Sequence, residues 1–277
     1  MNRTPAAAKI NLALVVGPRR ADGLHEVVTV LQRVDLCDTV GVEPAPALVV
    51  EGYRKDTLVR SALAKLSAAG VHSDADAFWR VRLEKRIPLA AGLGGGSADA
   101  AAALTLANRT LDEPLDEEDL SALAAQVGAD VPFFLTPGPK LGEGAGERLR
   151  ALELPQDYWI SIAVPRFARK DSTADVYRRF DEFGGGHDFD EKRAALLQAL
   201  KGVRRPRDFA AFPPNDLATA SGRSPLVDEL LEQGAFRADV SGAGPAVYGL
   251  FHHRSDAERT ARRLRTRARV WVLAPVW

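Results

Sequence analysis

A glycine-rich run ahead of an alanine-rich segment, PLAAGLGGGSADAAAAL, occupies residues 88–104. Four of its glycines fall within five positions, and a serine, Ser97, follows them. Glycine costs backbone entropy and packs no side chain, so such a cluster directly before a strong helix former needs a reason. Backbone N–H groups free of side chains, together with the positive N-terminal end of a helix, can hold phosphate oxygens. The run therefore predicts an anion site in front of a helix over residues 98–109, with Ser97 at the cap position.

The best-known nucleotide loops do not account for this run. A G-x-x-x-x-G-K-[ST] loop needs a lysine beside Ser97, and a G-x-G-x-x-G fingerprint needs a glycine in place of Ser97. The Ser97 hydroxyl can instead contact a phosphate or the Mg²⁺ that accompanies it. For an isolated glycine cluster, a tight turn with close helix packing explains the residues about as well as phosphate binding does. The surrounding sequence has to decide between the two.

The composition points to a neutral globular protein. The 37 basic and 37 acidic residues cancel, so no global field attracts nucleic acid or an anionic membrane. With 46% hydrophobic residues among 277, the chain can bury a real core, and its length favours two modest domains. Cys37 is the only cysteine, and Lys9 and Asn11 interrupt the apolar run near the start. We expect a cytoplasmic protein with no nucleic-acid or membrane partner.

The first half of the chain alternates short β-branched runs with helical patterns. We expect a mostly antiparallel sheet from strands at 10–16, 26–34, 38–43, 47–51 and 77–85. Helical periodicity predicts helices at 57–70, 98–109 and 115–128. The glycines within residues 140–152 predict a hairpin turn rather than a second phosphate loop.

The second half restarts after Pro155 with a recognisable order of elements. The predicted elements are a strand at 158–164, a helical region at 172–201, a helix at 224–234, strands at 236–240 and 247–251, a helix at 254–265 and a strand at 269–273. Strand, helix, two strands, helix and strand is the ferredoxin-like order. The sequence therefore predicts an α+β fold with two domains, residues 1–155 and 156–277.

Three segments, in this order along the chain, resemble the motifs of the GHMP kinase family: PAAAKINLALVV (5–16), PLAAGLGGGSA (88–98) and ADVSGAGPAVYGLF (238–251). The resemblance implies a two-domain ATP-dependent kinase that acts on a small-molecule alcohol in the cleft between its halves. It implies that the central motif binds ATP, with Mg²⁺ arriving on the nucleotide. The implied ATP-binding residues are Pro88, Leu89, Ala90, Ala91, Gly92, Leu93, Gly94, Gly95, Gly96, Ser97 and Ala98.

Within the family, AKINL (8–12), RRADGLHEV (19–27) and GADVPFFL (128–135) resemble the members that phosphorylate a cytidine-diphosphate-linked methylerythritol on the non-mevalonate route to isoprenoids. The resemblance implies that Lys9 and Asp130 form the catalytic pair. A carboxylate can take or orient the hydroxyl proton, and an ammonium can balance the charge on the transferring group. Taken singly, Lys9 is typical of an edge strand and Asp130 of a helix C-terminal turn.

The same resemblance implies a set of substrate-binding residues: Asn11, His25, Thr173 and Tyr177. Leu24 stands where the family usually has a tyrosine that stacks on the cytosine. Tyr177 has helical spacing to apolar neighbours, so plain core packing is its alternative role. FPPNDL (212–217) also resembles a family segment, although Asn215 and Asp216 could serve only to cap a helix.

Other functions stay open on the sequence alone. Another GHMP kinase activity, such as that of a homoserine or mevalonate kinase, is the alternative, because those enzymes share the three motifs. The basic stretch 258–269 could bind RNA in a non-catalytic protein of the same fold. Ala257, Ala261 and Leu264 form one apolar face there, which favours a helix with its arginines in solvent. The five histidines lack metal-ligand spacing, so we expect no dedicated metal site, and we expect a monomer or a weak homodimer.

Overall fold

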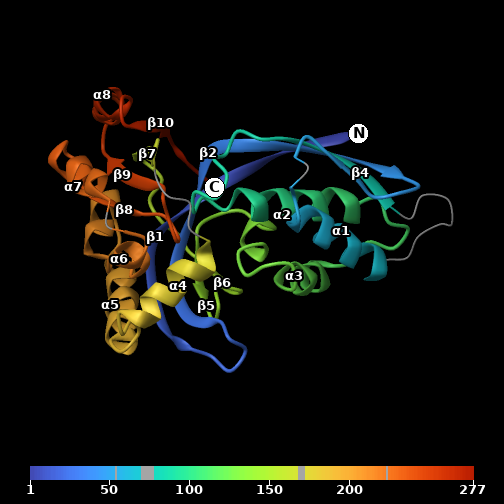
Figure 1. Cartoon of the computed structure of the whole chain (residues 1–277), viewed down its shortest axis with the longest axis horizontal. Coiled ribbons are helices and arrows are strands. Elements are labelled where there is room, and N and C mark those ends of the chain that lie inside the picture. Colours follow the sequence, from blue (N-terminus) through green and yellow to red (C-terminus); the bar gives the residue numbers. More distant parts are fainter. Residues whose placement is uncertain (54, 70–77, 168–171, 223) are drawn as a thin grey trace. The chain divides into compact units, whose positions relative to one another are not determined.

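The computed structural model describes residues 1–53, 55–69, 78–167, 172–222 and 224–277 (Figure 1). Packing groups the chain into two compact units that interleave along the sequence. Unit 1 comprises Met1–Ala8, Leu36–Leu89 and Gly94–Pro137, and unit 2 comprises Lys9–Asp35, Ala90–Leu93 and Gly138–Trp277. The sequence predicted a different division, into domains 1–155 and 156–277. That division stays a prediction.

Two long strands contribute residues to both units: β1 (Asn2–Arg19) and β2 (His25–Ala45). β2 is continuous where the sequence predicted two strands at 26–34 and 38–43. Asp35 and Asp38, which suggested a turn in the sequence, instead form hydrogen bonds to neighbouring segments. Asp35 N–H donates to Ala274 O, and the buried Asp38 carboxylate accepts from the N–H groups of Arg86 and Ile87. Partners distant in sequence therefore satisfy the polar groups that local reasoning assigned to a turn.

Unit 1 packs helices on the sheet formed by β2, β3 (Val49–Glu51) and β4 (Phe78–Glu84). β4 pairs antiparallel with β2 and parallel with β3, so the expected sheet is mostly but not entirely antiparallel. The helices of unit 1 are α1 (Leu58–Ala69), α2 (Gly95–Asn108) and α3 (Glu117–Ala125), followed by the short 3₁₀ turn η1 (Pro132–Phe134).

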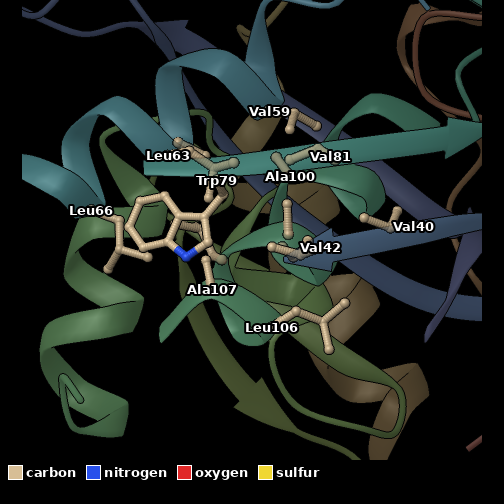
Figure 2. Close-up of a cluster of buried hydrophobic side chains, with 14 of the residues drawn as sticks. Val40, Val42, Val59, Leu63, Leu66, Trp79, Val81, Ala100, Leu106 and Ala107 are labelled. Atoms are coloured by element: carbon tan, nitrogen blue, oxygen red, sulfur yellow. The ribbon is translucent and has the colours of Figure 1, made fainter. Parts of the chain in front are cut away.

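Side chains from β2, β4, α1 and α2 gather into one hydrophobic core in unit 1 (Figure 2). Trp79 is fully buried at its centre, and its indole Nε1–H donates to Thr110 Oγ1 at 2.8 Å. The alanines of α2 let this helix approach its neighbours closely, because a methyl group is all that separates the backbones. The alanine-rich segment after the glycines thus forms a core helix.

In unit 2, the hairpin predicted within residues 140–152 is confirmed. It consists of β5 (Lys140–Glu143) and β6 (Arg148–Ala151), with Gly144 and Gly146 in the left-handed region of the turn at φ 76° and 110°. β5 and the short β11 (Pro275–Val276) both pair antiparallel with β2.

The ferredoxin-like order is confirmed in the same unit. Its sheet runs β10-β7-β9-β8 with every neighbour antiparallel. The strands are β7 (Trp159–Pro165), β8 (Arg237–Val240), β9 (Val247–Phe251) and β10 (Ala268–Leu273), and α7 (Pro225–Glu232) and α8 (Arg254–Leu264) pack against them. α8 buries Ala257, Ala261 and Leu264, so the prediction of an apolar face beneath a basic helix is also confirmed.

The helical region predicted at 172–201 is two helices, α4 (Thr173–Glu182) and α5 (Phe189–Gly202). Gly184 and Gly186 separate them, at φ 69° and 87°. The 3₁₀ segment η2 (Pro206–Ala211) and the one-turn helix α6 (Leu217–Ala220) follow. Among the described residues, no helix combines the length and apolar character needed to cross a membrane.

Candidate active site

The first half of the glycine motif lies against the C-terminal glycine motif within unit 2. Gly92 has φ 79°, and a Cβ on it would lie only 2.0 Å from Ser241 O. Two hydrogen bonds hold the segments together, from Ser241 Oγ to Gly92 O at 2.9 Å and from Ala246 N to Ala91 O at 3.1 Å. Only glycine fits at position 92, because the two backbones touch there and the conformation is left-handed.

Lys9 lies beside the same two motifs. Its N–H donates to Leu93 O at 2.9 Å, and a Cβ on Gly242 would lie 3.5 Å from Lys9 Nζ. Lys9 Nζ donates to Asn11 Oδ1 at 2.7 Å, and Asn11 Nδ2 donates to Thr29 Oγ1 at 2.8 Å. Both Lys9 and Asn11 are buried. Asn11 therefore orients the ammonium group, from the same face of β1 two residues away.

The loop at 241–246 has its own support from FPPNDL. Asn215 Nδ2 donates to Val240 O at 2.9 Å and to Gly242 O at 2.7 Å, while Asn215 Oδ1 accepts from Leu217 N. Asp216 stands at the N-cap of α6 without a side-chain capping bond, and it accepts from Lys192 Nζ and from Val16 N instead. The segment predicted as a possible cap thus braces the C-terminal glycine loop.

The second half of the glycine motif opens α2 in unit 1, and here the sequence prediction was wrong in one detail. α2 begins at Gly95 with Gly94 as its N-cap at φ 70°, so Ser97 is the third helical residue rather than the cap. The first intrahelical hydrogen bond runs from Ala98 N to Gly94 O. The N–H groups of Gly95, Gly96 and Ser97 precede it, and such groups have no partner within their own helix. They form the donor set expected of a phosphate site.

A buried charge cluster that the sequence reasoning missed lies beside this helix end. Lys85 Nζ bridges the carboxylates of Asp38 and Asp99, which are 0% and 1% exposed. A Cβ on Gly95 would lie 3.5 Å from Asp38 Oδ2 and 3.0 Å from the Ile87 side chain. The cluster therefore supports the first turn of α2 from inside. One signal was available, because Asp99 is the only charged residue between positions 97 and 108.

Burial changes the acidity of this cluster. Desolvation raises the pKa of Asp99 to about 7, Lys85 opposes this effect, and the charges of Asp38 and Asp56 add to it. The two carboxylates raise the pKa of Lys85 despite its burial. Oδ1 of Asp99 is buried without a hydrogen-bond partner. One lysine thus serves two carboxylates, which leaves an excess negative charge in the interior whenever both are ionised.

His25 and Tyr177, both predicted to bind substrate, meet in unit 2. Their ring centroids are 4.8 Å apart at an interplanar angle of 32°. His25 Nε2 lies 2.7 Å from Asp181 Oδ1. Tyr177 is half-buried against the apolar cluster under α4, so it packs on the core and contacts His25 at once. Thr173 is the exposed first residue of α4, and Asp181 was not singled out in the sequence.

Asp130, the other half of the predicted catalytic pair, lies in unit 1. It is half-buried in the turn between α3 and η1, where Val131 N donates to Gly128 O at 3.0 Å. Lys9 belongs to unit 2. The catalytic roles of Lys9 and Asp130, and their pairing, stay predictions.

A cavity of about 570 Å³ lies elsewhere in unit 2, among α4, α5, α6, α7 and β8. Its lining includes Phe180, Lys192, Asn215 and Asp216, and none of the predicted catalytic or substrate-binding residues. Within the described part of the chain, no group of three or more histidine, cysteine, aspartate or glutamate side chains could hold a metal ion.

Comparison with known proteins defines the class. The N-terminal domain of the GHMP kinases matches residues 57–138, and their C-terminal domain matches residues 224–269. The first match contains the whole central glycine motif and Asp130, and the second contains the C-terminal glycine loop.

Relatives of nearly full length narrow the class further. A protein from Pelotomaculum thermopropionicum named 4-diphosphocytidyl-2-C-methyl-D-erythritol kinase is 38% identical over 94% of this chain and 92% of its own. A protein of the same name from Desulfitobacterium hafniense is 37% identical over 96% of this chain and 93% of its own. The chain is a kinase and belongs to the 4-diphosphocytidyl-2-C-methyl-D-erythritol kinases within the GHMP kinase family.

Solved structures agree with the fold. A crystal structure of a 4-(cytidine 5'-diphospho)-2C-methyl-D-erythritol kinase superposes with a TM-score of 0.78 at 35% identity, with both chains covered completely. A mevalonate kinase reaches a TM-score of 0.73 at 12% identity, with 100% of this chain and 99% of its own covered, which shows the shared fold alone.

The contact at Gly92 yields a stability prediction. Gly92→Ala is expected to lower the free energy of unfolding by about 3 kcal/mol more than Gly222→Ala does, because a methyl group at 92 collides with Ser241 O. Gly222 is the matched control, since its φ of 82° is similar and no atom lies within 4 Å of its Cβ position. Urea unfolding of both variants measures the difference. Equal losses would show that backbone strain, and not the contact, explains the glycine.

The Lys85 cluster yields a pH prediction. Between the ordinary carboxyl pKa near 4 and a pKa of about 7, the folded protein holds a proton on Asp99 that the unfolded chain has lost. This group therefore lowers stability as pH rises through that window. Asp99→Asn, which cannot ionise, is expected to gain about 2 to 4 kcal/mol relative to wild type between pH 4 and 8.

Urea unfolding at several pH values checks this expectation, with Asp112→Asn as the control because Asp112 is exposed. A constant difference between Asp99→Asn and wild type across the pH range would contradict it.

Proposed function

We propose that this kinase transfers the γ-phosphoryl group of ATP to a hydroxyl of 4-diphosphocytidyl-2-C-methyl-D-erythritol, a step of the non-mevalonate route to isoprenoids. The name shared by relatives that are 37% and 38% identical over nearly the whole chain supports this substrate. The observation that carries the proposal is the joining of the three motifs: Lys9 and the Gly92 and Gly242 segments lie together, as a phosphoryl-transfer site requires.

In this proposal the nucleotide phosphates bind to the main chain of residues 88–98. The N–H groups of Gly95, Gly96 and Ser97 donate to the phosphate oxygens, and the positive end of α2 stabilises their charge. The Ser97 hydroxyl contacts a phosphate or the Mg²⁺ carried by ATP. Mg²⁺ bound with ATP would supply neutralisation of charge on the phosphates.

Lys9 and Asp130 perform the chemistry in this proposal. The substrate oxygen forms a bond to the γ-phosphorus while the bond from that phosphorus to its bridging oxygen breaks, and ADP leaves with the electron pair. Asp130 accepts the hydroxyl proton or orients the hydroxyl. Lys9, held by Asn11 at 2.7 Å, balances the charge on the transferring group.

The cytidine end of the substrate is assigned to His25, Thr173 and Tyr177. An imidazole and a phenol whose rings lie 4.8 Å apart offer both a flat surface and hydrogen-bonding edges to a base. We also propose that the enzyme is a cytoplasmic monomer or weak homodimer, and that its two family domains meet near residues 155 and 156.

A substrate panel read out by ADP release tests the function. Purified enzyme with ATP and Mg²⁺ receives the cytidylated methylerythritol, mevalonate or homoserine in parallel, with no acceptor as the background. We expect turnover of the cytidylated substrate at least 100-fold above background. Turnover of mevalonate or homoserine in its place would overturn the assignment, and RNA binding without any turnover would favour a non-catalytic protein.

The role of Asp130 yields a separate prediction. Asp130→Asn is expected to lower kcat by roughly 10²- to 10⁴-fold while ATP affinity stays within about 2-fold, because the amide cannot accept the proton and the phosphate site is untouched. Steady-state kinetics and nucleotide titration measure both quantities. Asp112→Asn is the control, as an exposed aspartate on the same unit. Near wild-type turnover in Asp130→Asn would remove this residue from the mechanism.

A further inference from the structure

One face of α4 carries three polar side chains at intervals of four residues. Thr173, Tyr177 and Asp181 are spaced i, i+4 and i+8, so they follow one stripe of the helix. Val176 and Phe180, which lie next to this stripe around the helix and are 1% and 7% exposed, fix α4 to the core. The helix therefore presents the stripe in a fixed orientation.

His25, at the start of β2, lies against this stripe. Its side chain is 6% exposed, whereas the Asp181 side chain is 43% exposed. Tyr177 contacts the imidazole face at a tilt, and Phe180 contacts it edge-on with the ring centroids 6.1 Å apart. The imidazole is thus held on its faces by aromatic rings and at Nε2 by the carboxylate of Asp181 at 2.7 Å.

The Asp181 carboxylate determines which ring nitrogen of His25 carries the proton. An ionised carboxylate can only accept a hydrogen bond, so Nε2 donates to Asp181. In a neutral imidazole the other nitrogen, Nδ1, then keeps its lone pair and is an acceptor. Cytosine presents an amino group at position 4, which donates, whereas uracil presents a carbonyl oxygen there, which accepts. An acceptor nitrogen that faces position 4, rather than the N3–H of uracil, therefore favours cytosine over uracil.

We propose that Asp181 is a positioning residue that sets the ring orientation and proton of His25, so that the imidazole selects an amino-pyrimidine over an oxo-pyrimidine in the nucleotide part of the substrate. The proposal rests on the proposed function, because it assigns His25 to the base. Asp181 acts through His25 and does not touch the reacting atoms. Its carboxylate is joined to a residue 156 positions away in sequence, which is why no local pattern indicated it.

Kinetics with two substrates form the first test. The wild type and Asp181→Ala are compared on the cytidylated substrate and on its uridine analogue, with KM and kcat measured separately for each and for ATP. Asp181→Ala is expected to raise KM for the cytidylated substrate about 10-fold. It is also expected to reduce the preference for cytidine over uridine, in kcat/KM, by about 10-fold or more, with kcat and the KM for ATP within 2-fold.

Two variants control this test. Asp181→Asn keeps an oxygen that can accept from Nε2, so we expect it to retain most of the preference. Glu182→Gln changes the next residue of the same helix, an exposed carboxylate that pairs with Arg178 at 3.4 Å, and we expect no change. A loss of preference in Glu182→Gln, or an equal loss in Asp181→Asn and Asp181→Ala, would overturn the positioning role.

Nitrogen chemical shifts of His25 form the second test and need no substrate. Long-range proton–nitrogen correlation spectra, assigned with His25→Gln, are expected to show Nε2 protonated and Nδ1 unprotonated in the wild type. Asp181→Ala is expected to lose this single form. Two protonated nitrogens in the wild type at neutral pH, or an unchanged spectrum in Asp181→Ala, would refute the proposal.

The two tests separate this inference from the proposed function. A wild type that uses the cytidylated substrate, with Asp181→Ala unchanged in preference, refutes the role of Asp181 and leaves the function intact. A wild type inactive on that substrate refutes the function and with it the role of His25 in choosing the base.

Discussion

The approach of two backbones at Gly92 and Ser241 is the constraint on which the candidate site depends. A side chain at position 92 would overlap the Ser241 carbonyl oxygen, and hydrogen bonds from Ser241 Oγ and Ala246 N close the contact on both sides. The next residue, Leu93, accepts from the N–H of Lys9. Backbone contacts, with one side-chain bond from Ser241, therefore hold the strand that carries Lys9 against the first glycine segment, which in turn contacts the second.

The side-chain nitrogens of Lys9 and Lys85 contact different kinds of group. Lys9 Nζ donates to the neutral amide oxygen of Asn11, which orients the ammonium group. Lys85 Nζ lies between the carboxylates of Asp38 and Asp99, which neutralise it. A lysine placed between two carboxylates in this way suits a charge that fixes structure.

Most elements followed from local patterns, because apolar periodicity and glycine placement act within a few residues. The ferredoxin-like order and the hairpin with Gly144 and Gly146 are of this kind. One failure is local: α2 starts at Gly95 because Gly94 adopts the left-handed cap. The others depend on partners far along the chain, since β2 stays unbroken at Asp38 because the distant Ile87 N–H satisfies its carboxylate. The links from Lys85 to Asp99 and from His25 to Asp181 likewise join separate elements.

The two parts of the site place different demands on the sequence. The phosphate motifs depend on backbone contacts that allow only glycine at Gly92, so they tolerate little change. The stripe of α4 depends on side chains alone, because the neighbouring Val176 and Phe180 and the bond from Arg179 Nε to Ala220 O at 2.7 Å hold the helix itself. Residues on that stripe can change without disturbing the phosphate motifs. The fold that this chain shares with a mevalonate kinase at 12% identity therefore leaves the side chains of the stripe free to differ.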